Sequence, residues 1–171
     1  MSSQISHAIK GRTKANDIFI TPRELAKQQI DMIETKDGDV WLDPCRNSAD
    51  GSYYSQFPNG NHEWCEIIEN KSFFDFNKPV DIICQNPPYS ILNDWIKKNI
   101  ELNPRVISML IGINNLTARR IEMLENAGYG LTKMKMMKVF KWYGMSCIVQ
   151  FEKDKDSIIE FDRKVWRIES L

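Results

Sequence analysis

The stretch Val80–Ser90, VDIICQNPPYS, decides how the rest of the chain is interpreted. The apolar, β-favouring run from Val80 to Cys84 predicts a short buried strand. Pro87 and Pro88 end that strand, because a proline has no backbone N–H to donate to a neighbouring strand. The Asn86–Tyr89 tetrad therefore stands at the carboxyl end of a strand, which is where open α/β sheets bind their ligands.

The chemical groups of this tetrad suit a planar exocyclic amine. Such an amine can donate one hydrogen to the Asn86 side-chain oxygen and another to a carbonyl around Pro87, while Tyr89 stacks on its ring. Adenine carries an amine of this kind. The alternative interpretation is structural: a proline-terminated strand followed by an ordinary helix over Ile91–Ile100, capped by Ser90.

The tetrad Asn86-Pro87-Pro88-Tyr89 resembles the catalytic motif of S-adenosylmethionine-dependent amino-methyltransferases, above all the DNA adenine-N6 family. The resemblance covers roughly residues 17–151 and is closest to small, virus- or phage-like forms without a separate target-recognition domain. It implies an α/β fold of Rossmann-like type, a doubly wound, mostly parallel sheet with a C-terminal antiparallel hairpin, known as the class I methyltransferase fold. It also implies S-adenosyl-L-methionine as cofactor and catalytic roles for Asn86, Pro87, Pro88 and Tyr89.

Length and charge limit the organisation of the chain. Its 171 residues predict one domain, over residues 17–171, after a flexible arm over residues 1–16. Lys and Arg together number 23, as do Asp and Glu, so no overall positive charge attracts nucleic acid. Any contact with nucleic acid is therefore expected to be local or to come from a partner.

The four cysteines and the apolar segments indicate the compartment. Cys45, Cys65, Cys84 and Cys147 lie far apart without a Cys-x-x-Cys pair, which favours reduced, mostly buried thiols over disulfides or a metal site. No segment has the apolar length of a signal peptide or a membrane span. We therefore expect a cytoplasmic protein in a reducing compartment, with no bound metal and no membrane contact.

The first helix is predicted to begin at Thr21-Pro22, with Thr21 as cap and Pro22 at the first helical position. Apolar residues at helical spacing from Leu25 to Ile33 continue it, and it is expected to end near 36–38. By resemblance, Thr21 and Pro22 help to wall the methyl-donor pocket.

A strand over Asp39–Leu42 and a turn over Asp43–Ser52 follow. A glycine-containing turn after a strand lets backbone amides approach a nucleotide-like ligand. The turn resembles the family's first motif, an Asp-Pro followed by Gly-x-Gly, although Asn47 stands where the first glycine is expected. Asparagine tolerates left-handed backbone, so the turn remains possible. The resemblance assigns the cofactor to Asp43, Pro44, Cys45 and Gly51.

The next segment carries the expected contacts to the ribose and the adenine of the cofactor. A short helix over 52–57 precedes a predicted strand over His62–Ile68, and Glu66 near its end can accept hydrogen bonds from ribose hydroxyls. Glu69 is the neighbouring alternative. By resemblance, Ser72 and Phe73 occupy the place of an Asp-Phe pair that contacts the adenine, unless Asp75-Phe76 is the true match.

The C-terminal half is predicted to continue the alternation of strands and helices. The most apolar run, Val106–Ile113, reads as a central strand buried on both faces. Thr117 is expected to cap a helix over Ala118–Asn126, stopped at Gly128-Tyr129-Gly130. An edge strand within Thr132–Trp142, a strand over Ser146–Phe151 and a terminal helix over Asp156–Ile168 complete the chain.

The edge strand is the candidate nucleic-acid contact. Lysines interleaved with aromatic residues can bind phosphates and stack on bases, here Lys133, Lys135, Lys138, Lys141 and Trp142. The alternative is that edge lysines protect the strand from pairing with other chains.

The sequence thus predicts methyl transfer from S-adenosylmethionine to the N6 amine of adenine, with DNA, or RNA, as partner. Transfer to RNA adenine or to protein glutamine is the alternative within the same chemistry. A non-catalytic methyltransferase-like subunit of a larger complex is the alternative outside it. Because the chain has few residues for reading a target sequence, a second copy or a partner protein is expected to contribute to recognition.

Overall fold

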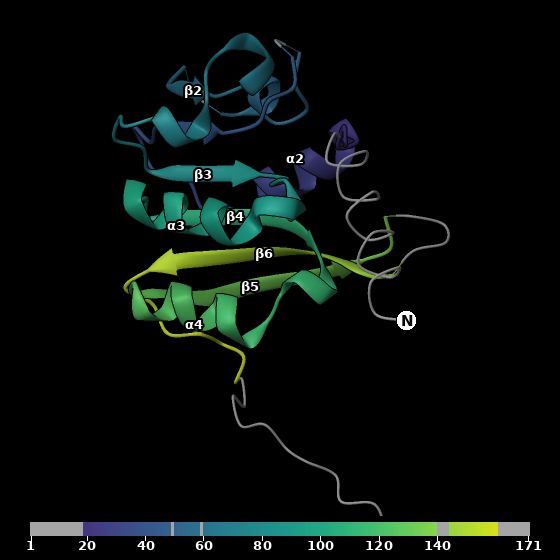
Figure 1. Cartoon of the computed structure of the whole chain (residues 1–171), viewed down its shortest axis with the longest axis vertical. Helices are drawn as coiled ribbons and strands as arrows, with labels where there is room; N and C mark the ends of the chain where they lie inside the picture. The colour runs from purple at the N-terminus through teal and green to yellow at the C-terminus, as the bar shows by residue number, and fades with distance from the viewer. Residues whose placement is uncertain (1–18, 49, 59, 140–143, 161–171) are drawn as a thin grey trace, which may run out of the picture.

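One six-stranded sheet organises the computed structural model, which describes residues 19–48, 50–58, 60–139 and 144–160. The strand order is β2-β1-β3-β4-β6-β5 (Figure 1). The first four strands in this order are parallel, and β6 pairs antiparallel with both β4 and β5. This confirms the predicted mostly parallel sheet with a C-terminal hairpin. The strands are β1 (Trp41–Asp43), β2 (His62–Trp64), β3 (Ile82–Gln85), β4 (Val106–Gly112), β5 (Tyr129–Met137) and β6 (Ser146–Lys153).

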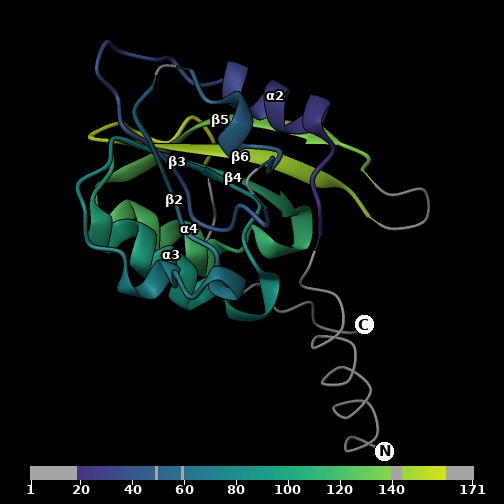
Figure 2. The ribbon, with the colours of Figure 1, turned by 90° about the horizontal axis from the view of Figure 1, so that it is seen from above.

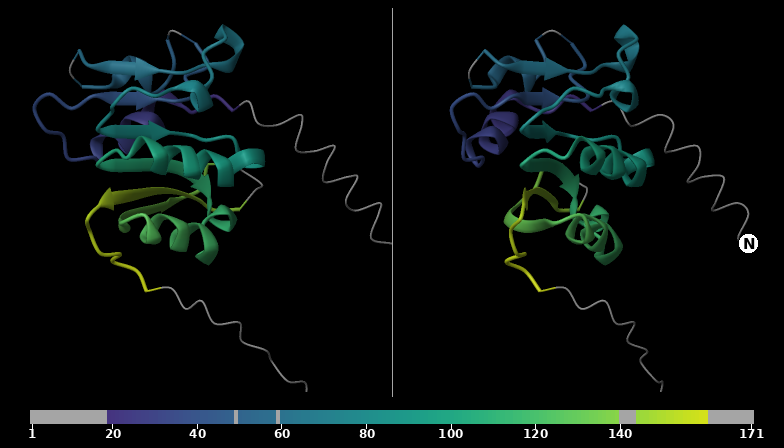
Figure 3. Two further views of the ribbon diagram at one scale, coloured as in Figure 1. Left: turned by 60° about the vertical axis from the view of Figure 1, so that its left-hand side comes forward. Right: turned by 90° about the vertical axis from the view of Figure 1, so that its left-hand side faces the viewer.

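Helices cover both faces of the sheet. Figure 2 shows α2 (Arg23–Asp31) on one face and both α3 (Leu92–Leu102) and α4 (Ala118–Asn126) on the other, and Figure 3 shows the strands stacked between them. The alternation of side chains along β3 serves both layers. Ile82 and Cys84 join the core beneath α2, whereas Ile83 joins the core beneath α3.

The first helix departs from the prediction at both ends. Pro22, not Thr21, is its N-cap, because the Thr21 hydroxyl accepts a hydrogen bond from Asn86 instead. The helix ends at Asp31, well before residues 36–38. Residues 34–39 contain no apolar side chain, so a helix continued through them would bury nothing in the core.

Two other local predictions were wrong, and a third fails over the residues that the structure describes. Residues 52–57 form only the single 3₁₀ turn Tyr54–Gln56, and α3 is capped at Ile91 without a side-chain bond, so Ser90 is not its cap. The predicted terminal helix is absent over 156–160, and its remaining residues lie outside the described part. The Thr117 cap is confirmed, since its side chain accepts a hydrogen bond from the Arg120 N–H.

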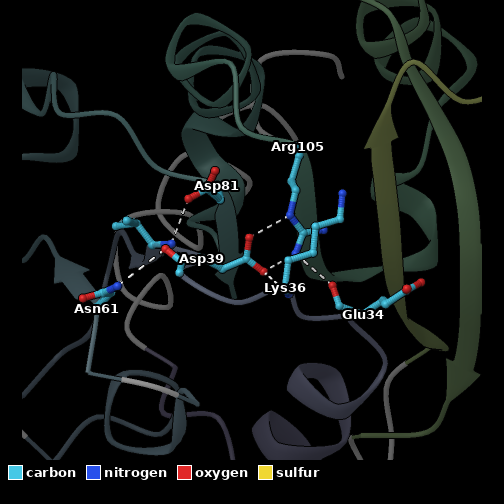
Figure 4. A network of polar contacts seen from close by, with 8 residues as sticks. Glu34, Lys36, Asp39, Asn61, Asp81 and Arg105 are labelled. Carbon is cyan, nitrogen blue, oxygen red and sulfur yellow. Dashed lines mark hydrogen bonds and ion pairs between the residues drawn. The ribbon is translucent and has the colours of Figure 1, made fainter.

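A network of ion pairs and hydrogen bonds closes the amino edge of the parallel strands (Figure 4). The buried Asp39 carboxylate accepts from Arg105 Nε at 2.9 Å and from the Lys36 N–H at 2.6 Å. Arg105 also donates to the Glu34 carbonyl at 2.9 Å, and the Asp81 carboxylate accepts from the Val40 N–H at 2.8 Å. The polar groups of this edge thus bond to one another.

The four cysteines are free thiols, three of them buried and Cys45 partly exposed. Among the helices of the described residues, none has both the length and the apolar character needed to cross a bilayer.

Candidate active site

The loops that leave β1, β2 and β3 meet at the carboxyl edge of the sheet and enclose two adjoining cavities. The larger has a volume of about 400 Å³, within the range of small-molecule sites. The smaller has about 60 Å³. Four residues line both cavities and so form the wall between them: Phe19, Cys45, Asn47 and Asn86.

The loop after β1 folds around the Asp43 side chain. Asp43 is fully buried, and its carboxylate accepts from the Cys45 and Tyr54 N–H groups, each at 3.2 Å. Burial raises the pKa of Asp43 to about 7, an effect that outweighs the two N–H groups which lower it. The nearby Glu66 charge raises the pKa further. Asp43 lines the smaller cavity, and Pro44 lines the larger one.

Asn47 and Gly51 give this loop its shape. Asn47 has φ 63°, the left-handed backbone for which asparagine was expected to substitute for glycine. At Gly51 any side chain would collide with backbone, because an added Cβ would lie 2.2 Å from the Arg46 carbonyl oxygen. Gly51 lines the smaller cavity. The loop therefore brings backbone close to the cavity with one glycine rather than two.

Glu66 lies just after β2 and joins two loops at the larger cavity. The prediction placed Glu66 inside this strand, but β2 ends at Trp64. Its buried carboxylate accepts from the Asn47 N–H at 2.7 Å and the Ile68 N–H at 3.1 Å. The alternative acid, Glu69, points elsewhere and forms a two-oxygen pair with Arg46 at 2.9 and 3.0 Å. Of the two acids, only Glu66 lines the cavity.

The far wall of the larger cavity is aromatic and apolar. Ser72 and Phe73 line it, whereas Asp75 and Phe76 are not part of the lining. The Ser72 hydroxyl accepts from the Phe74 N–H at 3.2 Å and caps a 3₁₀ turn. Phe73 packs against Trp95 with ring centroids 4.6 Å apart. Exposed apolar residues at the rim, Ile67, Ile68, Phe74 and Ile91, complete this side.

Asn86 is held in place by its neighbours on both sides. Its side-chain Nδ2 donates to Thr21 Oγ1 at 3.1 Å, and its backbone carbonyl accepts from the Cys45 thiol at 3.3 Å. Thr21 lines the smaller cavity, but Pro22 does not. With Nδ2 engaged by Thr21, the side-chain oxygen of Asn86 is the atom left to accept a hydrogen from a ligand.

The other members of the tetrad lie differently. Pro87 is buried, while Pro88 lines the larger cavity and caps the turn Tyr89–Ile91. The Tyr89 ring is 39% exposed and lies towards β4, where a Cβ added at Gly112 would come within 4.0 Å of it. Burial raises the pKa of Tyr89 to about 12. Tyr89 thus presents an uncharged ring beside the cavity opening rather than inside it.

The lysines predicted to contact nucleic acid lie in different surroundings. Lys133 Nζ donates to the carbonyl of Met32, the C-cap of α2, at 2.6 Å, and Lys135 Nζ donates to Gln28 Oε1 within α2 at 2.8 Å. Lys138 is exposed beyond the end of β5, on the same sheet edge as the cavities. Lys141 and Trp142 lie outside the described residues.

The structure also adds residues that the sequence reasoning missed. Tyr53 lines the smaller cavity together with Asn86, and its hydroxyl is joined to Gln29 by a 2.7 Å hydrogen bond; Gln29 is fully buried and Tyr53 almost fully. A signal was available for Gln29, since it is a polar residue on the apolar stripe of α2. Within the described part of the chain, no three His, Cys, Asp or Glu side chains gather as a metal site requires.

Comparisons with known proteins agree at the level of the fold. No protein-family model matches the sequence, and no curated protein does. The structure is similar to magnesium protoporphyrin IX methyltransferase (ChlM) from Synechocystis PCC 6803 with bound SAM, with TM-score 0.56 and 10% sequence identity, covering 77% of this chain and 79% of that one. The same enzyme with bound SAH gives TM-score 0.53, 10% identity and coverage of 77% and 82%. The chain therefore has the class I methyltransferase fold.

Proposed function

We propose that the protein transfers a methyl group from S-adenosylmethionine to the N6 amine of adenine in DNA. The observation that carries the proposal is the position of Asn86. It begins an Asn-Pro-Pro-Tyr tetrad at the carboxyl end of β3, lines both cavities and has its amide nitrogen engaged by Thr21. Its oxygen is then the acceptor for an amine hydrogen.

The residues around the two cavities fit S-adenosylmethionine. The volume of the larger cavity, the aromatic wall at Phe73 and the buried Glu66 carboxylate suit an adenosine group. The tight backbone at Gly51, where a Cβ has no room, suits the amino-acid end. Asp43, Pro44, Cys45 and Ser72 complete these walls, and Thr21 joins the smaller one, with Pro22 next to it at the start of α2.

The proposed chemistry assigns simple tasks to the chain. When bound, S-adenosylmethionine supplies an electrophilic methyl group on a sulfonium, so no nucleophilic side chain is needed. Asn86 Oδ1 and the Pro87 carbonyl accept the two amine hydrogens and direct the nitrogen lone pair towards the methyl group. Transfer would form the N–C bond and break the S–C bond, which would leave a neutral thioether on the cofactor, and the amine would release one proton to water.

Tyr89 and Lys138 would receive the nucleic acid. An adenine extruded from the duplex can stack on the exposed Tyr89 ring. Lys138, exposed at the same edge, is placed to meet a phosphate. Target reading by a second copy of the chain, or by a partner protein, belongs to the same proposal.

The test is transfer of a labelled methyl group to three acceptors: duplex DNA containing adenine, the matching RNA, and a glutamine-containing peptide. The proposal predicts label in DNA, lost by at least about 100-fold in Asn86→Ala. Asn126→Ala, which removes an exposed asparagine amide from the end of α4, is the control and keeps full activity. Label in RNA or peptide but not in DNA would replace the substrate class. No label in any acceptor, with the fold intact, would favour a non-catalytic subunit.

A further inference from the structure

A chain of buried hydrogen bonds runs from Asn86 into the core beneath α2. Asn86 Nδ2 donates to Thr21 Oγ1 at 3.1 Å, and the Thr21 side chain hydrogen-bonds to Tyr53. The Tyr53 hydroxyl donates to Gln29 Oε1 at 2.7 Å. The exposed fractions are 3% for Thr21, 5% for Tyr53 and 0% for Gln29, so these side chains have little contact with bulk water, although Thr21 and Tyr53 also line the smaller cavity.

The direction of every bond in this chain is fixed from its inner end. Gln29 Nε2 donates to the Gln85 carbonyl at 3.2 Å and to Ser108 Oγ at 3.0 Å. A carbonyl only accepts, so the Gln29 amide cannot rotate by half a turn without placing two acceptors against each other. Gln29 Oε1 must therefore face Tyr53, and the Tyr53 hydroxyl must donate to it.

The donor and acceptor roles of Tyr53 and Thr21 in turn determine which atom of Asn86 faces Thr21. Because the Tyr53 hydrogen is used on Gln29, the Tyr53 oxygen is free to accept the hydrogen of the Thr21 hydroxyl. Thr21 Oγ1 then has only lone pairs left for its other neighbour. It can accept from Asn86 Nδ2 but cannot donate to Asn86 Oδ1. The side-chain oxygen of Asn86 is thereby turned away from Thr21.

We propose that Gln29 and Tyr53 are positioning residues that set the orientation of the Asn86 amide through Thr21. The inference rests on the proposed function, in which Asn86 Oδ1 accepts a hydrogen from the substrate amine. An Asn86 amide turned by half a turn would present N–H groups to that amine, donor against donor. The Gln29–Tyr53 pair disfavours this orientation before any substrate arrives.

A purely structural role for the pair makes a different prediction, and the molecule contains a matched control. Tyr53→Phe keeps the ring in the core beneath α2 and removes only the hydroxyl. Tyr129→Phe removes another buried hydroxyl, which donates to the Pro104 carbonyl, also at 2.7 Å, near the opposite edge of the sheet. A structural role alone would lower the melting temperature of both variants similarly and spare kcat in both.

The experiment measures kcat for DNA methylation, the melting temperature and S-adenosylmethionine affinity in both variants. We expect kcat to fall about tenfold in Tyr53→Phe and to stay unchanged in Tyr129→Phe, with similar losses of melting temperature. Tyr53 lines the smaller cavity, but its hydroxyl is engaged by Gln29 and Thr21, and the Tyr129 hydroxyl donates to the Pro104 carbonyl. Cofactor affinity should therefore stay within about twofold in both variants. Equal kcat in Tyr53→Phe and wild type would overturn the inference.

A second readout does not depend on activity. The side-chain amide resonances of Asn86 can be identified in a ¹H–¹⁵N spectrum by their loss in Asn86→Ala. They should shift in Tyr53→Phe and remain in place in Tyr129→Phe. Unchanged Asn86 resonances in Tyr53→Phe would refute the relay whatever the substrate is. A wild-type protein that methylates no DNA, yet shows the shift, would refute the proposed function and leave the relay standing.

Discussion

Asp39, two residues before β1, and Asp43, the last residue of β1, have pKa values shifted in opposite directions. Burial alone would raise the pKa of Asp39, but the Arg105 and Lys36 donors outweigh it and hold that pKa below its ordinary value. Asp43 is also buried, and its direct partners are two backbone N–H groups. Its pKa is raised to about 7.

This difference distinguishes the amino edge of the sheet from the carboxyl edge, where the candidate site lies. At the amino edge, carboxylates, a guanidinium and backbone groups satisfy one another. At the carboxyl edge, Asp43, Glu66 and Asn86 surround two cavities with acceptor oxygens that no side-chain cation of the described residues binds. Buried acceptor oxygens without a cationic partner lower the stability of the protein unless a ligand hydrogen-bonds to them, and such groups are typical of functional sites.

The largest expected effect is on the pH dependence of stability, and it comes from replacing Asp43 with a side chain that does not ionise. Since the folded-state pKa lies above the ordinary 3.8, the folded protein binds more protons than the unfolded chain between about pH 4 and 7. Stability therefore falls as pH rises through this window, by about 4 kcal/mol from this group. Asp43→Asn should remove that fall, so its stability relative to wild type should increase by about 3 kcal/mol between pH 5 and pH 8. Urea unfolding at both values measures it; a stability difference between the two proteins that is the same at both pH values would contradict the account.

The opposite edge should respond to loss of its cation. Arg105→Met leaves the buried Asp39 carboxylate without its guanidinium partner, which is expected to lower the unfolding free energy by about 3 kcal/mol. Thermal melting measures this, with the exposed Arg119→Met on α4 as a control that changes it by less than about 0.5 kcal/mol. S-adenosylmethionine affinity should be preserved below the melting range. Parallel loss of affinity would mean that the two edges are not separate.

Gly51→Ala tests how closely the backbone approaches the cavity. The new Cβ would lie 2.2 Å from the Arg46 carbonyl oxygen, so the loop must shift, at about 2 kcal/mol of stability. Affinity for S-adenosylmethionine should fall by about tenfold, because this loop lines the smaller cavity. Gly60→Ala meets nothing within 4 Å and is the control. Calorimetry showing equal affinities for the two variants would exclude the loop from the site.

The smallest effect distinguishes two lysines of the same strand region. Lys133→Met removes a donor from the Met32 carbonyl just past α2 and should lower stability by about 0.5 kcal/mol without changing DNA affinity. Lys138→Met should leave stability unchanged and reduce the salt dependence of DNA binding by about one ion. Binding measured across salt concentrations checks both; the reverse pattern would place the DNA contact over α2.

The sequence predicted the parts of the site that short-range chemistry determines. The two prolines, the apolar run before them and the turn at Asn47 and Gly51 each act within a few residues, so their positions follow from the sequence. Glu66, the predicted ribose contact, lines the larger cavity, although the strand before it is shorter than expected.

The features of the fold and the site that were not predicted depend on contacts between segments far apart in the sequence. Residues 52–57 do not continue as a helix because Gln56 Nε2 donates to the Arg23 carbonyl at 2.9 Å, which fixes this turn against the start of α2. Thr21 is drawn away from its expected capping role by Asn86, a residue far along the chain. The partnership of Gln29 and Tyr53 likewise follows from the packing of α2 on the sheet.

The most direct test is calorimetric titration of the wild-type protein with S-adenosylmethionine. The account predicts saturable binding of about one molecule per chain, with a dissociation constant of about 1–100 μM, typical of small cofactor sites. A protein that is folded by circular dichroism, yet binds no S-adenosylmethionine at millimolar concentration, would contradict it.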